Sequence, residues 1–123
     1  MTLRVLIVDD NTSFLDAALI LLEREGLHVA GVASTVAGAR REARELRPDV
    51  VLVDITLGTE SGFELVRDLA EHPWDGGLAM ILISTHAEAD FTDLIAESPA
   101  TGFLPKSELS ADAIRRILDG RSR

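Results

Sequence analysis

Short runs of apolar, mostly β-branched residues recur along the chain and predict five strands, at residues 3–8, 27–32, 50–53, 78–84 and 101–104. The runs at 3–8, 50–53 and 78–84 contain almost no polar residues, which is typical of parallel strands buried on both faces. The run at 27–32 is less uniformly apolar, so we expect this strand to lie nearer the edge of the sheet.

Between these runs, apolar residues recur at the spacing of a helix. Helices are therefore predicted at residues 12–25, 34–46, 62–71, 88–97 and 110–118. Asn11 or Thr12 can cap the first helix, and Ser61 with Glu64 matches a capping box before the third. Five alternating strand–helix units predict an α/β fold in one domain, residues 1–123, with a doubly wound parallel sheet and right-handed crossovers.

Composition excludes several classes of function. The 123 residues carry a net charge of −9, which opposes binding of phosphate backbones, so we expect this chain itself to bind no nucleic acid. The absence of cysteine excludes disulfides, thiol nucleophiles and thiolate metal sites. No apolar run is long enough to span a membrane and no signal peptide is recognisable, so we expect a cytoplasmic protein without a membrane partner.

Acidic residues follow two of the predicted strands. Asp9 and Asp10 follow the first, and Asp54 follows the third. The carboxyl ends of parallel strands meet at one edge of a sheet, so these carboxylates should converge and, because they repel one another, require a cation. Ser84 and Lys106 follow the fourth and fifth strands at the same edge. Lys106 is the only lysine in a chain that otherwise uses arginine, which indicates that its compact ammonium is needed.

Four segments in register resemble the receiver domain of bacterial two-component response regulators: LIVDDN (6–11), VLVDITLGTESGFEL (51–65), LIST (82–85) and GFLPK (102–106). The separations among Asp10, Asp54, Ser84 and Lys106 also agree with that family. The resemblance covers essentially the whole chain. It implies a flavodoxin-like, five-stranded parallel sheet of strand order 2-1-3-4-5, with five helices on both faces, and a signalling domain rather than an enzyme.

The resemblance also implies a metal site. Asp10 would bind Mg²⁺ (or Mn²⁺) directly and Asp9 would bind it directly or through water. Asp54 and the backbone carbonyl of Thr56 would supply further oxygens, which are the ligands that these hard cations prefer.

On the same resemblance, Asp54 takes a phosphoryl group from a sensor histidine kinase or a phosphotransfer protein. Lys106 would hold one phosphoryl oxygen as a point charge and the Ser84 hydroxyl would bond another. Phe103 matches the aromatic residue that turns inward when the domain switches.

Three positions depart from the commonest family pattern. Gly58 stands where proline is frequent after the phosphoacceptor, which predicts a more mobile loop. Ser107 follows Lys106 where proline is frequent, and Pro105 precedes the lysine instead, so a cis peptide after the lysine is not supported. Thr85 stands where a small residue is frequent beside Ser84.

Other interpretations of these residues remain open. Asp9 and Asp10 could cap the following helix, Asp54 could form a turn, and Lys106 could be a solvated loop residue. A haloacid-dehalogenase-type phosphohydrolase also uses an aspartate nucleophile, but it needs a second acid two positions later, where this chain has Thr56. The chain could also be the N-terminal receiver of a longer DNA-binding regulator.

The family's usual output surface consists of the fourth helix, fifth strand and fifth helix. Its charged residues here are Glu88, Asp90, Asp93, Glu97, Arg115 and Arg116. Opposite charges on one face suit a self-complementary contact, so a homodimer is an expected consequence of phosphorylation.

The remaining chemistry-bearing residues indicate no second site. His28, His72 and His86 lack the spacing of metal ligands, and Trp74 should lie at the edge of the sheet opposite the carboxylates. In the second helix we expect Ala37, Ala43 and Leu46 to face inward. The outer arginines, Arg40, Arg41 and Arg44, form a stripe that is typical of a solvated face. No glycine-rich nucleotide-binding motif is present.

Overall fold

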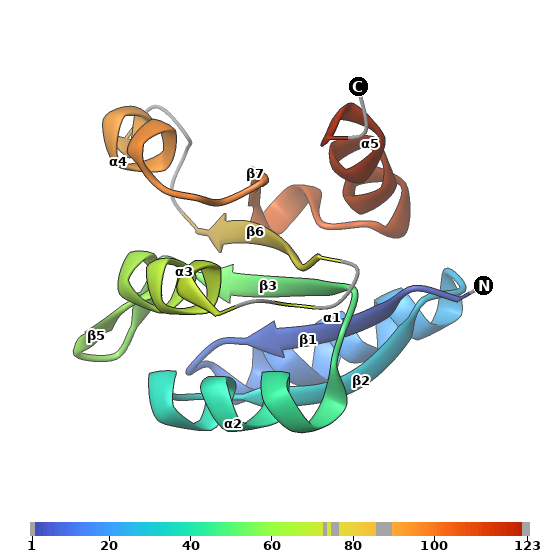
Figure 1. The fold of residues 1–123 in the computed structure, drawn as a ribbon. Coiled ribbons are helices and arrows are strands. Elements are labelled where there is room, and N and C mark those ends of the chain that lie inside the picture. The colour runs from blue at the N-terminus through green and yellow to red at the C-terminus, as the bar shows by residue number, and fades with distance from the viewer. Residues whose placement is uncertain (1, 73, 75–76, 86–89, 122–123) are drawn as a thin grey trace.

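The computed structural model describes residues 2–72, 74, 77–85 and 90–121, which form a parallel sheet covered by helices on both faces (Figure 1). The sheet has five strands in the order β2-β1-β3-β6-β7. Their bounds are β1 (Arg4–Val8), β2 (His28–Ala33), β3 (Val50–Asp54), β6 (Ala79–Ser84) and β7 (Gly102–Pro105). The order equals the predicted 2-1-3-4-5 once the short hairpin strands β4 (Thr56–Leu57) and β5 (Glu60–Ser61) are left out of the numbering.

The helices divide into two layers. They are α1 (Thr12–Arg24), α2 (Val36–Leu46), α3 (Gly62–Glu71), α4 (Thr92–Glu97) and α5 (Ala111–Arg121), with a 3₁₀ turn η2 (Lys106–Glu108) before the last. Side chains of α1 and α5 pack on one face of the sheet. Those of α2, α3 and α4 pack on the other (Figure 1).

The central strands are buried because both of their faces are covered. Residues 5–8 of β1 and 50–53 of β3 have no exposed surface, and alternate residues face the two layers. The strand β2 lies at one edge, as its weaker pattern predicts, and its Val32 is 41% exposed. The apolar pattern therefore predicted that the strands exist and that β2 lies at an edge of the sheet.

Caps fix where the helices begin. The Asn11 side chain accepts a hydrogen bond from the Phe14 amide at 3.1 Å, which starts α1. The Ser61 hydroxyl accepts from the Phe63 amide at 3.2 Å and starts α3. The beginning of α5 is held in two ways: the Ser110 hydroxyl accepts from the Ala113 amide at 3.0 Å, and the Ala111 amide donates to the Glu25 carboxylate at 2.7 Å.

Two helix predictions were wrong in part. In the described residues, α4 begins at Thr92 rather than at residue 88, and residues 86–89 lie outside the described part of the chain. The backbone of Phe91 has φ −131° and ψ 15°, which is not helical, so the helix does not extend to this residue. The centre of the Phe91 ring lies 6.4 Å from the centre of the Phe63 ring. At the other end, α5 runs on to Arg121, three residues past the last apolar position of the pattern.

The buried face of α2 also differs from the prediction. Ala37 is exposed, and the buried residues are Val36, Ala39 and Ala43. Val36, Ala39 and Ala43 lie at helical spacing and share the inner face, which leaves Ala37 outside it. The helix starts at Val36 because the Thr35 hydroxyl accepts from the Gly38 amide at 3.0 Å.

The described residues contain no helix with both the length and the apolar character required to cross a membrane.

Candidate phosphoacceptor and metal site

Three carboxylates meet at the carboxyl-terminal edge of the sheet. Asp9 and Asp10 follow β1, and Asp54 ends β3, the strand that pairs with β1. Each offers an oxygen, and these oxygens all lie within 4.8 Å of one another. Asp9 is fully buried, Asp54 is 7% exposed and Asp10 is exposed. The structure thus brings together the acidic residues that the strand pattern predicted would converge.

Lys106 reaches into this cluster from the end of β7. Its ammonium nitrogen lies 2.5 Å from Asp9 Oδ2 and 3.2 Å from Asp54 Oδ2. It also lies 4.4 Å from the centre of the Phe14 ring. Only 12% of the lysine side chain is exposed. Lys106 is therefore not a solvated loop residue, and it supplies a positive charge to two of the three carboxylates.

Backbone amides hold the remaining oxygens. The Asn11 amide donates to Asp9 Oδ1 at 2.9 Å, and the Thr56 amide donates to Asp54 Oδ1 at 3.2 Å. Because Asn11 is the N-cap of α1, the interpretation of Asp9 or Asp10 as the cap was wrong. These contacts fix one oxygen of Asp9 and one of Asp54 and leave the other of each facing Lys106.

The charges in the cluster shift the pKa values of two groups. Burial, followed by the neighbouring charge of Asp9, raises the pKa of Asp54 above its ordinary 3.8, although the Thr56 amide and Lys106 act in the opposite direction. Burial alone would lower the pKa of Lys106, but its hydrogen bond to Asp9 and the charges of Asp54 and Asp9 outweigh burial and raise it. Burial and the neighbouring carboxylate thus outweigh the single ammonium at Asp54, in a cluster that holds three carboxylates.

This donor set fits a divalent cation such as Mg²⁺. Carboxylate oxygens are its preferred protein ligands, and Asp10 is exposed and can be reached from water. Only one ammonium faces three carboxylates in the described residues, so the lysine alone does not balance their charge. A second cation at this edge would complete the compensation.

The pKa of Asp54 leads to a pH prediction. A carboxyl whose pKa is higher in the folded than in the unfolded state destabilises the fold once it ionises, so stability is lost as the pH rises from 3.8 through the folded value. We expect Asp54→Asn to be more stable than the wild type without metal, by a margin that grows as the pH rises above about 4. Urea unfolding at several pH values measures the margin. A stability difference that is constant with pH, or that Mg²⁺ leaves unchanged, would contradict the conclusion that ionised Asp54 destabilises the metal-free fold.

The loop after β3 packs tightly against the site. The Gly62 amide donates to the Ile55 carbonyl at 2.8 Å, and a Cβ atom at Gly62 would overlap the carbonyl oxygen of Asp54. Between Ile55 and Gly62, the strands β4 and β5 form an antiparallel hairpin, and Gly58 in its turn has φ +61°. That conformation favours glycine over proline, which accounts for this departure from the family pattern. The sequence did not identify Gly62, although a glycine directly after a helix cap is a recognisable signal.

The other predicted site residues lie at the same edge. Ser84 ends β6, is 3% exposed and pairs with Pro105, while its neighbour Ile83 pairs with Asp54. Phe103 is half-buried on β7 and packs against the layer that contains α3. The described peptide bonds are all trans, including the one between Lys106 and Ser107.

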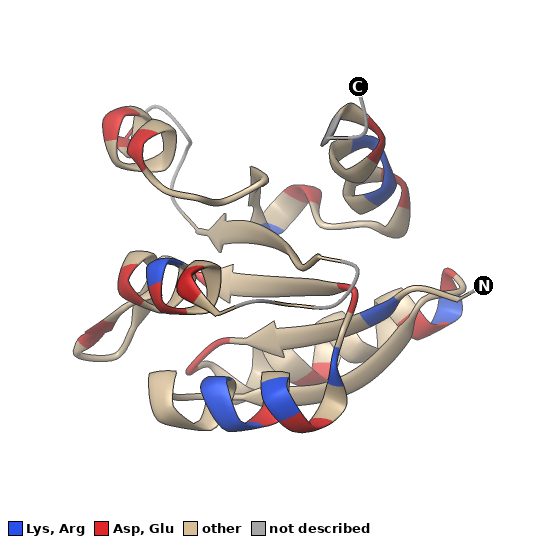
Figure 2. Ribbon diagram, viewed as in Figure 1, with Lys and Arg blue, Asp and Glu red and all other residues tan. Residues whose placement is uncertain are grey.

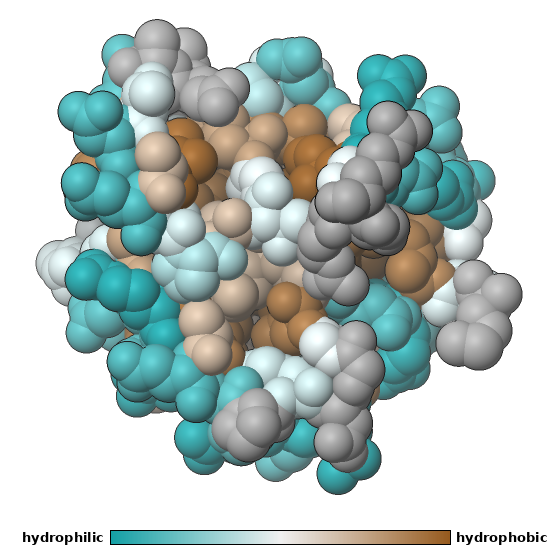
Figure 3. All heavy atoms as spheres, turned by 45° about the horizontal axis from the view of Figure 1, so that its top comes forward, coloured by the Kyte–Doolittle hydropathy of each residue, from teal (hydrophilic) through white to brown (hydrophobic). Residues whose placement is uncertain are grey.

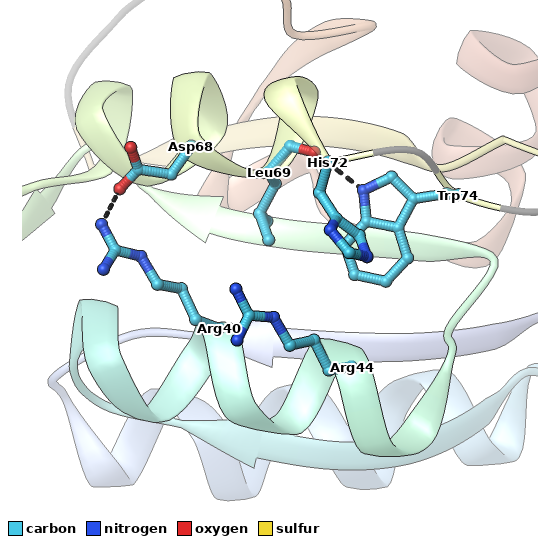
Figure 4. Close-up of a pocket in the computed structure, with 6 residues that line it drawn as sticks. All are labelled: Arg40, Arg44, Asp68, Leu69, His72 and Trp74. Carbon is cyan, nitrogen blue, oxygen red and sulfur yellow. Dashed lines mark hydrogen bonds and ion pairs between the residues drawn. The ribbon is translucent and has the colours of Figure 1, made fainter.

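The arginines of α2 and Trp74, for which the sequence indicated no site, lie away from the acidic cluster. Figure 2 shows basic residues along α2. Arg40 and Arg44 of α2 line one side of a groove of about 200 Å³ whose other side is formed by Asp68, Leu69, His72 and Trp74, and Figure 4 shows Arg40 reaching Asp68. Arg40 forms an ion pair with Asp68 of α3, so it is not simply a solvated residue. Trp74 precedes β6, at the opposite edge of the sheet from the carboxylates, as predicted, and its indole donates to the Leu69 carbonyl at 2.7 Å. His86 lies outside the described residues.

The predicted output surface is only partly described. Asp93 and Glu97 of α4 and Arg115 and Arg116 of α5 are exposed, whereas Glu88 lies outside the described residues. Leu94 of α4 is 52% exposed. On the side that carries α4, β7 and α5, Figure 3 shows apolar patches between polar rims. This face therefore combines charged and apolar groups.

Comparisons with known proteins agree with this geometry. A family model of the response regulator receiver domain matches residues 5–119. The response regulator GacA of Pseudomonas aeruginosa is 30% identical over 123 residues, covering 97% of this chain and 56% of that protein. The DNA-binding response regulator MtrA of Mycobacterium tuberculosis is 30% identical over 119 residues, covering 95% and 50%. The chain thus spans about half the length of the curated relatives it matches.

Solved structures show the same likeness. A CheY-like response regulator receiver domain from Methanospirillum hungatei superposes with a TM-score of 0.80 at 25% identity, covering 98% of this chain and 94% of that one.

Proposed function

The chain belongs to the response regulator receiver domain family, and from this membership and the geometry of the acidic site we propose that Asp54 is its phosphoacceptor. Domains of this family act in two-component signalling with histidine kinases or phosphotransfer proteins. One observation carries the proposal: an oxygen of Asp54 lies 3.2 Å from the ammonium of the chain's only lysine, in a cluster with two further carboxylates.

In the proposed step, a carboxylate oxygen of Asp54 attacks the phosphorus of a phosphohistidine on a sensor kinase or phosphotransfer protein. An oxygen–phosphorus bond forms, the phosphorus–nitrogen bond breaks, and the histidine keeps that electron pair. Aspartate suits this step because it is an anion at neutral pH, and because the acyl phosphate that it forms can be hydrolysed to reset the signal.

The other residues stabilise charge around the transferred group. Asp10, Asp9, Asp54 and the Thr56 carbonyl are the proposed ligands of Mg²⁺ or Mn²⁺, which neutralises charge on the phosphoryl oxygens when it is bound. In our proposal, the Lys106 ammonium turns from the carboxylates to a phosphoryl oxygen, and the Ser84 hydroxyl donates to another. Phe103, one position before Leu104 on β7, would carry the change to the α4, β7 and α5 surface.

Two further parts of the proposal concern the setting of this chemistry. We place the domain in the cytoplasm, which fits its lack of cysteine. We propose that phosphorylation brings two copies together through the α4, β7 and α5 surface, because acidic groups of α4 and basic groups of α5 can pair across a two-fold axis. The domain would stand alone or precede a DNA-binding output domain.

The experiment is incubation with acetyl phosphate and Mg²⁺, followed by intact-mass measurement. We expect one added phosphoryl group in the wild type and none in Asp54→Asn, and light scattering of the same samples should show a dimer only in the phosphorylated wild type. An unmodified wild type, or a group that still adds to Asp54→Asn, would overturn the phosphoacceptor assignment. Asp54-dependent turnover of a generic phosphate monoester would instead favour the phosphohydrolase.

A further inference from the structure

The ring of Phe14 is the neighbour of Lys106 that the proposed chemistry does not use. Phe14 lies in the first turn of α1, one turn after the two acidic residues, and its amide is held by the Asn11 cap at 3.1 Å. The ring is half-buried and packs against the core layer of α1 and α5. Its centre is 4.4 Å from the lysine nitrogen, which lies over the ring.

This contact has a specific physical consequence. The face of an aromatic ring carries partial negative charge and attracts an ammonium, more strongly where water is excluded. The Lys106 side chain is only 12% exposed, so few water molecules compete with the ring. A lysine ammonium has three N–H donors on a flexible stem; here Asp9 and Asp54 lie within reach of it, and the ring lies against it as well.

We propose that Phe14 is a positioning residue for phosphoryl transfer, whose ring holds the Lys106 ammonium at the acidic site. This inference rests on the proposed function of Asp54. An aliphatic residue of similar size would fill the same space but would not attract the ammonium. The Lys106 side chain would then occupy several orientations. Its ammonium would less often be in the orientation that binds the incoming phosphoryl group.

The contact can be tested without phosphorylation, because the chain contains a single lysine. Protein grown with ¹³C,¹⁵N-labelled lysine gives the signals of one residue, and protons that lie over an aromatic ring are shifted upfield. We expect the Lys106 methylene protons nearest the nitrogen to be upfield of those of free lysine. The shift should vanish in Phe14→Leu and Phe14→Met and persist in Phe14→Tyr and Phe14→Trp.

The positioning role is tested by the rate of modification with acetyl phosphate and Mg²⁺. Phe14→Leu and Phe14→Met should be slower than the wild type by about three- to tenfold, and the two ring-bearing variants should keep most of the rate. Rescue by Tyr or Trp separates the attraction of a ring from simple filling of space. If one variant does not fold, the other member of its pair makes the same comparison.

The NMR shift of Lys106 and the modification rates of the Phe14 variants each test the positioning role. A wild-type lysine without the upfield shift, or variants lacking the ring that react at the wild-type rate, would overturn the positioning role. A shift that is present in a wild type unable to accept a phosphoryl group would refute the proposed function of Asp54 while leaving the lysine–ring contact established.

Discussion

Replacing Lys106 with methionine should lower the free energy of unfolding of the metal-free protein by about 3 kcal/mol. Methionine keeps most of the volume of the side chain but removes the positive charge that lies 2.5 Å from Asp9 and 3.2 Å from Asp54. Fully buried Asp9 and nearly buried Asp54 would then repel each other without a counter-ion. Urea unfolding in the presence of a chelator measures the loss.

The same variant should respond more strongly to Mg²⁺ than the wild type does, because no ammonium competes with the ion for the carboxylates. Arg41→Met is the matched control: it removes one positive charge from an exposed position on α2 and should change stability by less than about 0.5 kcal/mol. If Lys106→Met were as stable as this control, or if Mg²⁺ stabilised both variants equally, Lys106 would not be the counter-ion of the site.

Replacing Gly62 with alanine should cost about 2–4 kcal/mol of stability and sharply reduce phosphorylation of Asp54. The added Cβ would overlap the Asp54 carbonyl oxygen and lie 3.0 Å from the Ile55 Cα. Both neighbours are backbone atoms, so no side-chain rotation relieves the clash, and either α3 or the end of β3 has to move. Thermal unfolding and intact mass after acetyl phosphate treatment measure the two effects.

Gly120→Ala serves as the control for this substitution. Gly120 also lies in a helix, but an added Cβ would meet no atom within 4 Å. Since alanine favours helix more than glycine does, this variant should be slightly more stable than the wild type, by about 0.5–1 kcal/mol. Loss of stability in both variants would point to a general effect of glycine replacement, whereas an unaffected Gly62→Ala would contradict the close packing described here.

The sequence predicted the sheet and the meeting of the carboxylates because both depend on local patterns. A buried strand is apolar along its whole length, and parallel strands necessarily bring their ends to one edge. Asp9, Asp10, Asp54 and Lys106 could therefore be assigned to one place from their positions after three of the apolar runs. The strand order itself came from resemblance to the receiver family, since periodicity does not distinguish neighbours in a sheet.

The features that were missed depend on contacts between distant segments. The closeness of Gly62 to Asp54 and the position of Lys106 over the Phe14 ring arise only when α3, α1 and the end of β7 are packed together. The start of α4 was misplaced for a related reason. Its sequence is compatible with a longer helix, but Phe91 packs against Phe63 in a conformation that is not helical.

The bond from the Ala111 amide to Glu25 ties the start of the last helix to the end of the first. A chain made from its N-terminus supplies this acceptor long before the helix that needs it. The same order applies at the acidic edge: the three carboxylates are synthesised first, and Lys106 follows 52 residues after Asp54. A growing chain that has already folded β1 and β3 together would hold the carboxylates without their ammonium. Until Lys106 packs against Asp9 and Asp54, water and dissolved ions would solvate these carboxylates in place of the protein's own cation.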